Sequence, residues 1–185
     1  MTRRTTASAL RKHQKSHELV RVGRVWSEET FEGYVGAVSG QWAALTPLAG
    51  NIFLDGYAVV RLDDITSLEP RGGPESFPAR SLTLDGAWPP PPLPEDVELA
   101  SARGILASAA RRYRLVSIYI ERDDPGVVFR GRVAGFDQKS LRLLELSSAA
   151  QWSREPTAWR LDEITRVDFG GEYERKLLRV ADEPR

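Results

Sequence analysis

An internal repeat constrains this chain more than any other feature of its sequence. The segment RLDDIT at residues 61–66 returns as RLDEIT at residues 160–165. Upstream, in the same order, FEGYV at residues 31–35 matches FRGRV at residues 129–133. The start and end of the match also align, because Leu19-Val20 corresponds to Leu115-Val116 and Gly72-Gly73 to Gly170-Gly171. An ordered match of this length predicts a duplicated module, at residues 8–73 and 104–171.

Each copy is predicted to form one helix followed by five short strands. Hydrophobic alternation, β-branched residues and turn chemistry indicate the strands. Gly131 and Gly135 stand inside one of them, and glycine in a strand interior is typical of a bulge or a sharp bend. The expected helices cover residues 7–16 and 95–112. The expected strands cover residues 19–25, 31–38, 43–48, 57–62 and 65–68, then 115–120, 127–136, 141–146, a strand starting at 159, and 164–169.

This order of elements resembles the Sm-like family of small barrels. Residues 129–137 (FRGRVAGFD) are similar to the first Sm motif, a bent strand with internal glycines followed by an aromatic residue and an Asp at the turn. Leu161 and Ile164 are similar to the start of the second motif. The resemblance implies a mainly β fold of two tandem five-stranded barrels, each preceded by a helix. Other SH3-like barrels fit the same short motifs.

The domain organisation follows from the repeat. We expect a first barrel with a basic N-terminal helix at residues 1–73, a Pro-rich linker at 74–94, and a second barrel with helices at both ends at 95–185. The prolines at 89–92 impose an extended conformation. They indicate a strap pinned by Trp88 and Leu93, or alternatively a docking site for a proline-binding domain.

Two further elements are predicted around these modules. Residues 81–85 are expected to add a short strand. Residues 171–180 are expected to form a short helix that caps the second barrel with Tyr173, Leu177 and Val180 on one face, the alternative being a partner-binding helix.

Composition narrows the possible functions. The chain has no Cys, which excludes disulfides and thiolate metal sites. Its formal net charge is zero, and no segment approaches the roughly 20 apolar residues of a membrane helix. We therefore expect a soluble, cytoplasmic protein that does not bind membranes. His13 and His17 lack a third ligand nearby, so neither a metal nor another cofactor is expected.

No catalytic residues are predicted. The acid pairs Asp63-Asp64 and Asp162-Glu163 occur once per copy, which favours a role in holding a corner of the fold over acid–base chemistry. Nucleophile-elbow, phosphate-loop and dinucleotide motifs are missing from the sequence. The sequence thus indicates a protein that is not an enzyme.

Two functions remain open. The resemblance implies RNA binding, and a basic cluster near the N-terminus is suited to phosphate contacts, although it also fits a solvated arm. The family's pocket residues are not carried over, because Ser140 stands near the usual Asn and Leu161 follows Arg160. The alternative is a protein–protein adaptor that assembles through strand edges, which neutral charge also fits. The predicted RNA-binding residues are Arg3, Arg4, Arg11, Lys12, Lys15, Arg21 and Arg24.

Overall fold

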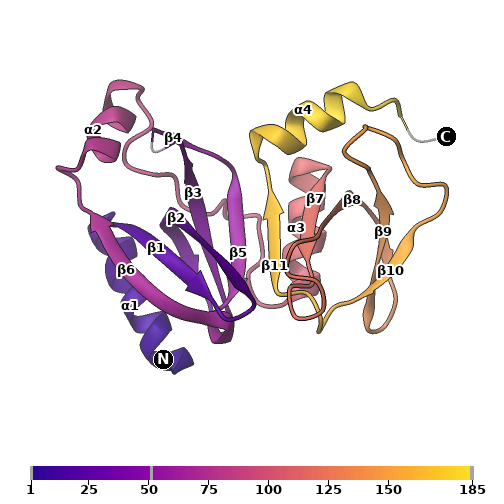
Figure 1. The fold of residues 1–185 in the computed structure, drawn as a ribbon, viewed down its shortest axis with the longest axis horizontal. Helices are drawn as coiled ribbons and strands as arrows, with labels where there is room; N and C mark the ends of the chain where they lie inside the picture. The colour runs from indigo at the N-terminus through magenta and orange to yellow at the C-terminus, as the bar shows by residue number, and fades with distance from the viewer. Residues whose placement is uncertain (1, 51, 184–185) are drawn as a thin grey trace. The chain divides into compact units, whose positions relative to one another are not determined.

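The computed structural model describes residues 2–50 and 52–183, and the chain divides into two compact units, residues 1–95 and 96–185. Both units are built mainly from antiparallel strands, and the described residues also contain four α-helices (Figure 1). The prediction of a mainly β protein is therefore confirmed.

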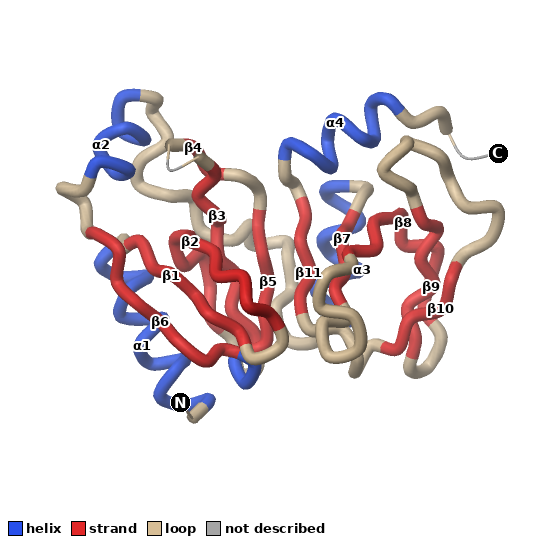
Figure 2. Tube along the Cα trace, viewed as in Figure 1, coloured by secondary structure: helices blue, strands red, loops and turns tan. Residues whose placement is uncertain are grey.

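The first unit contains one five-stranded antiparallel sheet in the order β5-β3-β2-β1-β6, with a short strand β4 paired to β3 (Figure 2). Helix α1 precedes the sheet, and a 3-10 turn η1 connects its last two strands. The elements are α1 (Arg3–Ser16), β1 (Leu19–Arg24), β2 (Ser27–Val38), β3 (Trp42–Ala49), β4 (Phe53–Leu54), β5 (Tyr57–Arg61), η1 (Leu62–Asp64), β6 (Ile65–Gly72) and α2 (Phe77–Leu84).

The second unit repeats this arrangement. Its antiparallel sheet has the order β10-β9-β8-β7-β11, with one helix before it and one after it. The elements are α3 (Ala102–Tyr113), β7 (Val116–Tyr119), β8 (Val128–Phe136), β9 (Ser140–Glu145), β10 (Thr157–Arg160), β11 (Arg166–Phe169) and α4 (Glu172–Val180).

The two sheets pair their strands in the same register. Val20 lies opposite Gly33 in the first unit, and Val116 lies opposite Gly131 in the second. The long central strand of each sheet carries a bulge at the matching place, between Val35 and Ala37 and between Val133 and Gly135. The repeated sequence segments thus occupy equivalent places in the two units.

Neither sheet is closed by backbone pairing. Among the residues that the structure describes, no ladder joins β5 to β6 or β10 to β11. The second half of the repeat is nevertheless equivalent in both units, because Arg61 lies opposite Trp42 and Arg160 lies opposite Ser140. Each unit is therefore an open, bent sheet covered by a helix.

The close approach of neighbouring strands explains why both copies of the repeat have a glycine at the same place, Gly33 in the first and Gly131 in the second. A β-carbon at Gly33 would lie 2.9 Å from the carbonyl oxygen of Thr46 on the neighbouring strand. A β-carbon at Gly131 would collide with the Leu144 backbone and lie 2.8 Å from Cγ of Leu143. Both strands therefore approach their neighbours more closely than any side chain permits.

The Pro-rich segment packs on the first unit. The ring of Trp88 lies 5.4 Å from that of Tyr34, centroid to centroid, next to buried Leu19. The Tyr57 hydroxyl donates a hydrogen bond of 3.1 Å to the carbonyl of Pro92. Burial raises the pKa of Tyr34 to about 12. The side chain at residue 93 is also buried, so the segment is held along its length.

One predicted element was wrong, and a second begins later than predicted. Residues 81–84 belong to a helix rather than a strand, because Pro78 in the first turn favours a helix and Ala79 and Leu82 share its buried face. The helix expected from residue 95 begins only at Ala102. There the Ser101 hydroxyl accepts a 3.1 Å hydrogen bond from the Gly104 amide and caps the helix.

The C-terminal helix α4 forms as predicted, but its buried face differs. Leu177 packs against Leu115 and Leu146 of the second unit. Tyr173 and Val180, which were expected beside it, are 47% and 75% exposed. Residues 178 and 181 contact the core instead, so the helix is rotated relative to the predicted apolar face.

Candidate functional site: the basic face of α1

Helix α1 is fixed firmly to the first unit. Leu10 is fully buried in the core of that unit. The Gln14 side chain donates a 2.8 Å hydrogen bond to the carbonyl of Gly36, and the Arg3 guanidinium binds the Asp63 carboxylate, with 2.7 Å between Nε and Oδ1. The Thr2 and Thr5 side chains close a capping box at its start. The outer face of α1 is therefore a rigid surface rather than a loose arm.

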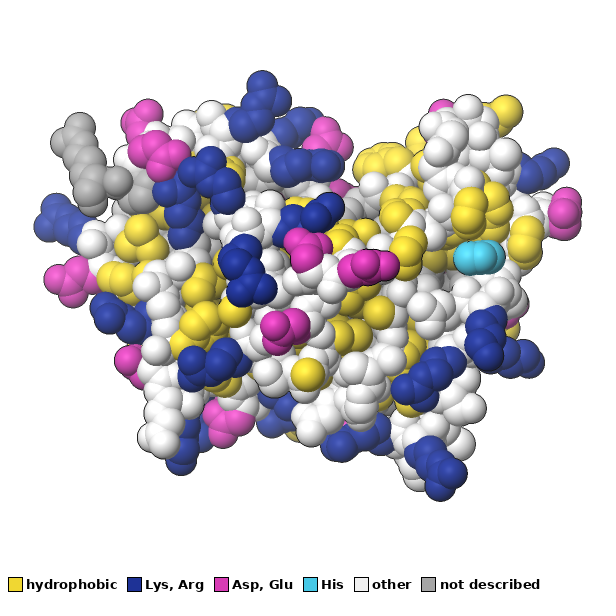
Figure 3. Space-filling model, turned by 180° about the vertical axis from the view of Figure 1, so that it is seen from behind, with side chains coloured by type: hydrophobic (Ala, Val, Ile, Leu, Met, Phe, Trp, Pro, Cys, Tyr) yellow, Lys and Arg dark blue, Asp and Glu magenta, His cyan; other side chains and the backbone are white. Residues whose placement is uncertain are grey.

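That outer face is basic. Arg4, Arg11, Lys12 and Lys15 are exposed and, together with Ser8, line one shallow depression. Their spacing of three, four and seven residues places them on one side of the helix. Residues 3–16 contain no carboxylate. In Figure 3, Lys and Arg side chains gather at the lower right, over the region of α1.

The other three predicted RNA-binding residues do not line this depression. Arg3 is paired with Asp63. Arg21 is on β1, where its Nη2 lies 2.8 Å from Oε1 of Glu32. Arg24 is buried, with its guanidinium 5.7 Å from the centre of the Phe31 ring. The structure therefore brings four of the seven basic residues together. Each of the remaining three contacts another side chain of the first unit.

The Arg3–Asp63 pair predicts a pH-dependent contribution to the anchoring of α1. The hydrogen bond and charge of Arg3 hold the pKa of Asp63 below its usual value. The pair therefore stabilises the fold above the unfolded pKa of Asp63, and this contribution is lost as pH falls through the lowered folded pKa. Both groups are exposed, so the effect is small. In urea unfolding, Asp63→Asn is expected to be less stable than the parent at pH 7 and to match it in strong acid; an equal difference at both pH values contradicts this.

The acid pairs make ordinary structural contacts. Asp64 accepts a 3.1 Å hydrogen bond from the indole nitrogen of Trp26. Asp162 and Glu163 both bind the guanidinium of Arg160. Each of these acids therefore has a polar partner within its own unit.

The two histidines do not converge with acids into a metal site. Nδ1 of His13 lies 2.7 Å from Oε2 of Glu18, and the His17 ring lies 6.0 Å from that of Trp88. Across residues 2–50 and 52–183, no three His, Cys, Asp or Glu side chains are placed to hold a metal ion.

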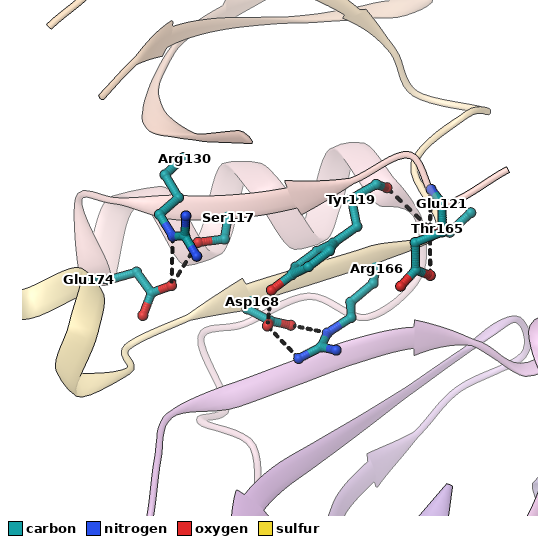
Figure 4. A network of polar contacts seen from close by, with 8 residues as sticks. All are labelled: Ser117, Tyr119, Glu121, Arg130, Thr165, Arg166, Asp168 and Glu174. Carbon is teal, nitrogen blue, oxygen red and sulfur yellow. Dashed lines mark hydrogen bonds and ion pairs between the residues drawn. The ribbon is translucent and has the colours of Figure 1, made fainter. Parts of the chain in front are cut away.

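A second polar cluster, which the sequence analysis missed, lies on the sheet of the second unit (Figure 4). The guanidinium of Arg166 binds Asp168 through two hydrogen bonds of 2.7 and 2.6 Å and lies 4.7 Å from the centre of the Tyr119 ring. The Tyr119 hydroxyl donates to Asp168 at 3.0 Å, and burial raises its pKa. The alternation of Arg166 and Asp168, two residues apart on one strand face, is the signal that was available in the sequence.

This cluster continues to the C-terminal helix. The Ser117 hydroxyl donates a 2.7 Å hydrogen bond to Oε1 of Glu174, and Nε of Arg130 lies 3.8 Å from the same oxygen. The buried hydroxyl of Thr165 donates to Oε2 of Glu121 at 2.9 Å. Because each of these groups has a partner inside the cluster, its main effect is to hold α4 and the strands in place.

Three tryptophans in or beside strands differ in burial. Trp42 is buried on β3, where the guanidinium of Arg61 lies 4.7 Å from its ring centre. Trp152 and Trp159 are only partly buried, and both belong to the second unit. Of these three, Trp42 is thus the one that belongs to the core of its unit.

Of the helices in the described parts of the chain, none has the length and apolar character needed to cross a membrane.

The comparisons with known proteins add no further evidence about these residues. The chain matches no protein-family model, no curated protein and no solved structure.

Proposed function

We propose that this protein is a non-enzymatic RNA-binding protein whose α1 contacts the phosphate backbone. The observation that supports the proposal is the basic face of α1: four exposed cationic side chains on a rigid helix that has no acid of its own. Lys and Arg side chains on such a surface bind phosphates by displacing condensed counterions. The whole chain has zero net charge, so attraction to phosphates depends on where basic side chains gather rather than on the net charge.

We propose further that each unit is an open barrel of the Sm-like, SH3-like type. Numbering the five strands of each unit in chain order, both sheets have the spatial order 4-3-2-1-5, with a helix before the first strand. This shared order, together with the resemblance of residues 129–137 to the first Sm motif, supports the proposal. The family's pocket residues are absent from the matching turns, so the proposed RNA contact is at α1 instead of in those turns.

A salt titration tests the proposal. Single-stranded RNA binding falls with salt at a slope of about 0.7 per phosphate neutralised. If the four basic side chains each neutralise one phosphate, affinity for a fluorescent oligouridylate is expected to fall about 50-fold between 50 and 200 mM salt. Anisotropy measures this directly, and binding that is absent at low salt removes the proposal.

The second candidate is an adaptor that assembles through strand edges. Within the second unit, β10 pairs only with β9, and most of its residues are exposed. Such an edge offers free backbone donors and acceptors to another chain. Sedimentation of the same samples distinguishes the two functions, since an assembling protein without RNA affinity favours the adaptor.

A further inference from the structure

A hollow in the second unit has the features of a small-ligand site. It lies between the start of β8 and the segment that follows β9, and its volume is about 390 Å³. That is within the roughly 300–1,000 Å³ typical of ligand pockets. Every residue that lines it belongs to the second unit, so its shape depends on that unit alone.

One part of the wall of the hollow is apolar and held in place by neighbouring side chains. Phe129 and Trp152 line it together with buried Leu146. Phe129 packs against the ring of Trp159, with 4.1 Å between centroids, and the guanidinium of Arg132 lies 4.8 Å from the centre of the Trp152 ring. Each lining ring is thus supported by a protein neighbour and does not need to be ordered by a ligand.

The segment that forms the far wall is also ordered by hydrogen bonds. Leu146 donates its amide hydrogen to the carbonyl of Arg130 at 2.7 Å, and Ser153 donates its amide hydrogen to the carbonyl of Glu145 at 2.8 Å. Ser147 and Gln151 exchange hydrogen bonds across the tip of this segment. The hollow is therefore a preformed feature of the fold.

The rim offers both hydrogen-bond donors and hydrogen-bond acceptors. The carboxylate of Glu145 accepts a 3.1 Å hydrogen bond from Trp159 through Oε1, which orients the group. Gln151 adds an exposed amide, and Ser148 adds an exposed hydroxyl. Arg130 also lines the hollow, but its guanidinium lies beside Glu174 and 4.7 Å from the centre of the Tyr173 ring, so the rim presents one carboxylate among neutral polar groups.

We propose that this hollow binds one unstacked nucleobase of the RNA. The proposal rests on the proposed function and adds to it a second, base-reading contact. A nucleobase is flat, neutral and apolar on its faces, and its edge carries donors as well as acceptors. Single-stranded RNA is recognised in this way, by packing splayed bases against aromatic side chains and by hydrogen bonds to their edges.

Free nucleosides test the pocket without the phosphate contacts. Adenosine, guanosine, cytidine and uridine are each titrated into the full-length ¹⁵N-labelled protein. At least one of them is expected to shift the amide signals of residues 147–153 in a saturable manner. If none does so at millimolar concentration, the pocket proposal is wrong, even if salt-dependent RNA binding is observed.

Two substitutions provide a local check. Ser148→Trp places a ring over the hollow and is expected to weaken nucleoside binding at least tenfold. Gln138→Trp adds the same ring at an exposed turn away from the hollow and is expected to leave binding unchanged. If Ser148→Trp disturbs the fold, Gln151→Ala, which only shortens an exposed side chain, is expected to weaken binding of the preferred nucleoside. Equal affinity in the pocket variants and the parent overturns the proposal.

The outcomes separate the two proposals. Saturable nucleoside binding together with salt-independent RNA binding leaves the pocket in place and removes the phosphate contact at α1. Salt-dependent RNA binding without any nucleoside response leaves α1 in place and removes the pocket. In the Ser148→Trp variant, the salt slope for RNA is expected to equal that of the parent, because this substitution does not touch α1.

Discussion

Replacing Gly131 by alanine is expected to lower the free energy of unfolding by about 3 kcal/mol, the largest stability effect of any single substitution considered for this chain. The new methyl group would collide with the backbone of Leu144 and press on the side chain of Leu143. Backbone atoms of a paired strand cannot rotate away, so the β8–β9 ladder must separate. Gly33→Ala meets the same obstacle at 2.9 Å from Thr46 and is expected to cost less, about 1–2 kcal/mol.

Gly126→Ala is the matched control. A β-carbon at Gly126 would meet nothing within 4 Å, so the same chemical change is expected to be nearly neutral there. Denaturant unfolding of the full chain gives the free energies, and hydrogen exchange locates the loss in the second unit for Gly131→Ala and in the first for Gly33→Ala. If Gly131→Ala costs no more than Gly126→Ala, the close approach of β8 and β9 is not real.

Neutralising the basic face of α1 is expected to abolish most of the salt dependence of RNA binding. The variant changes Arg4, Arg11, Lys12 and Lys15 to glutamine, a good helix former, at exposed positions. Loss of four phosphate contacts reduces the slope of log affinity against log salt by about 2.8. At 50 mM salt, we expect binding to an oligouridylate to fall at least tenfold, as measured by anisotropy.

A control with the same change in net charge isolates the position of the charges. The exposed basic residues of the second unit that serve for it are Arg111, Lys139, Arg154 and Arg175, all changed to glutamine. This control is expected to keep most of the parent's affinity and slope. If both variants lose the same affinity, the attraction comes from charge in general, and α1 is not the binding surface.

Local sequence pattern determined most of the strands. Each strand predicted within the repeat has a counterpart within a few residues, because alternation and internal glycines act on neighbouring positions. The failures involved competing local signals. Residues 81–85 look like a strand in isolation, but Pro78 and the burial of Ala79 and Leu82 favour a helix once the segment packs on the first unit.

The candidate site was predicted only in part. The basic cluster was visible in the sequence, and the helical period places Arg4, Arg11, Lys12 and Lys15 on one face. The sequence did not reveal that Arg24 would be buried beside Phe31 or that Glu32 would bind Arg21. Those partners lie on other strands, and the pairing register, not chain proximity, brings them into contact.

The sequence by itself determined that one unit is used twice, since a repeated order of glycines, strands and turns leads to the same strand pairing in each half. Only the tertiary structure decided which charges face solvent and where a hollow forms. The α1 surface depends on which helix side is packed against the sheet. The hollow beside Phe129 and Trp152 depends on the path of a loop that no short-range pattern specifies.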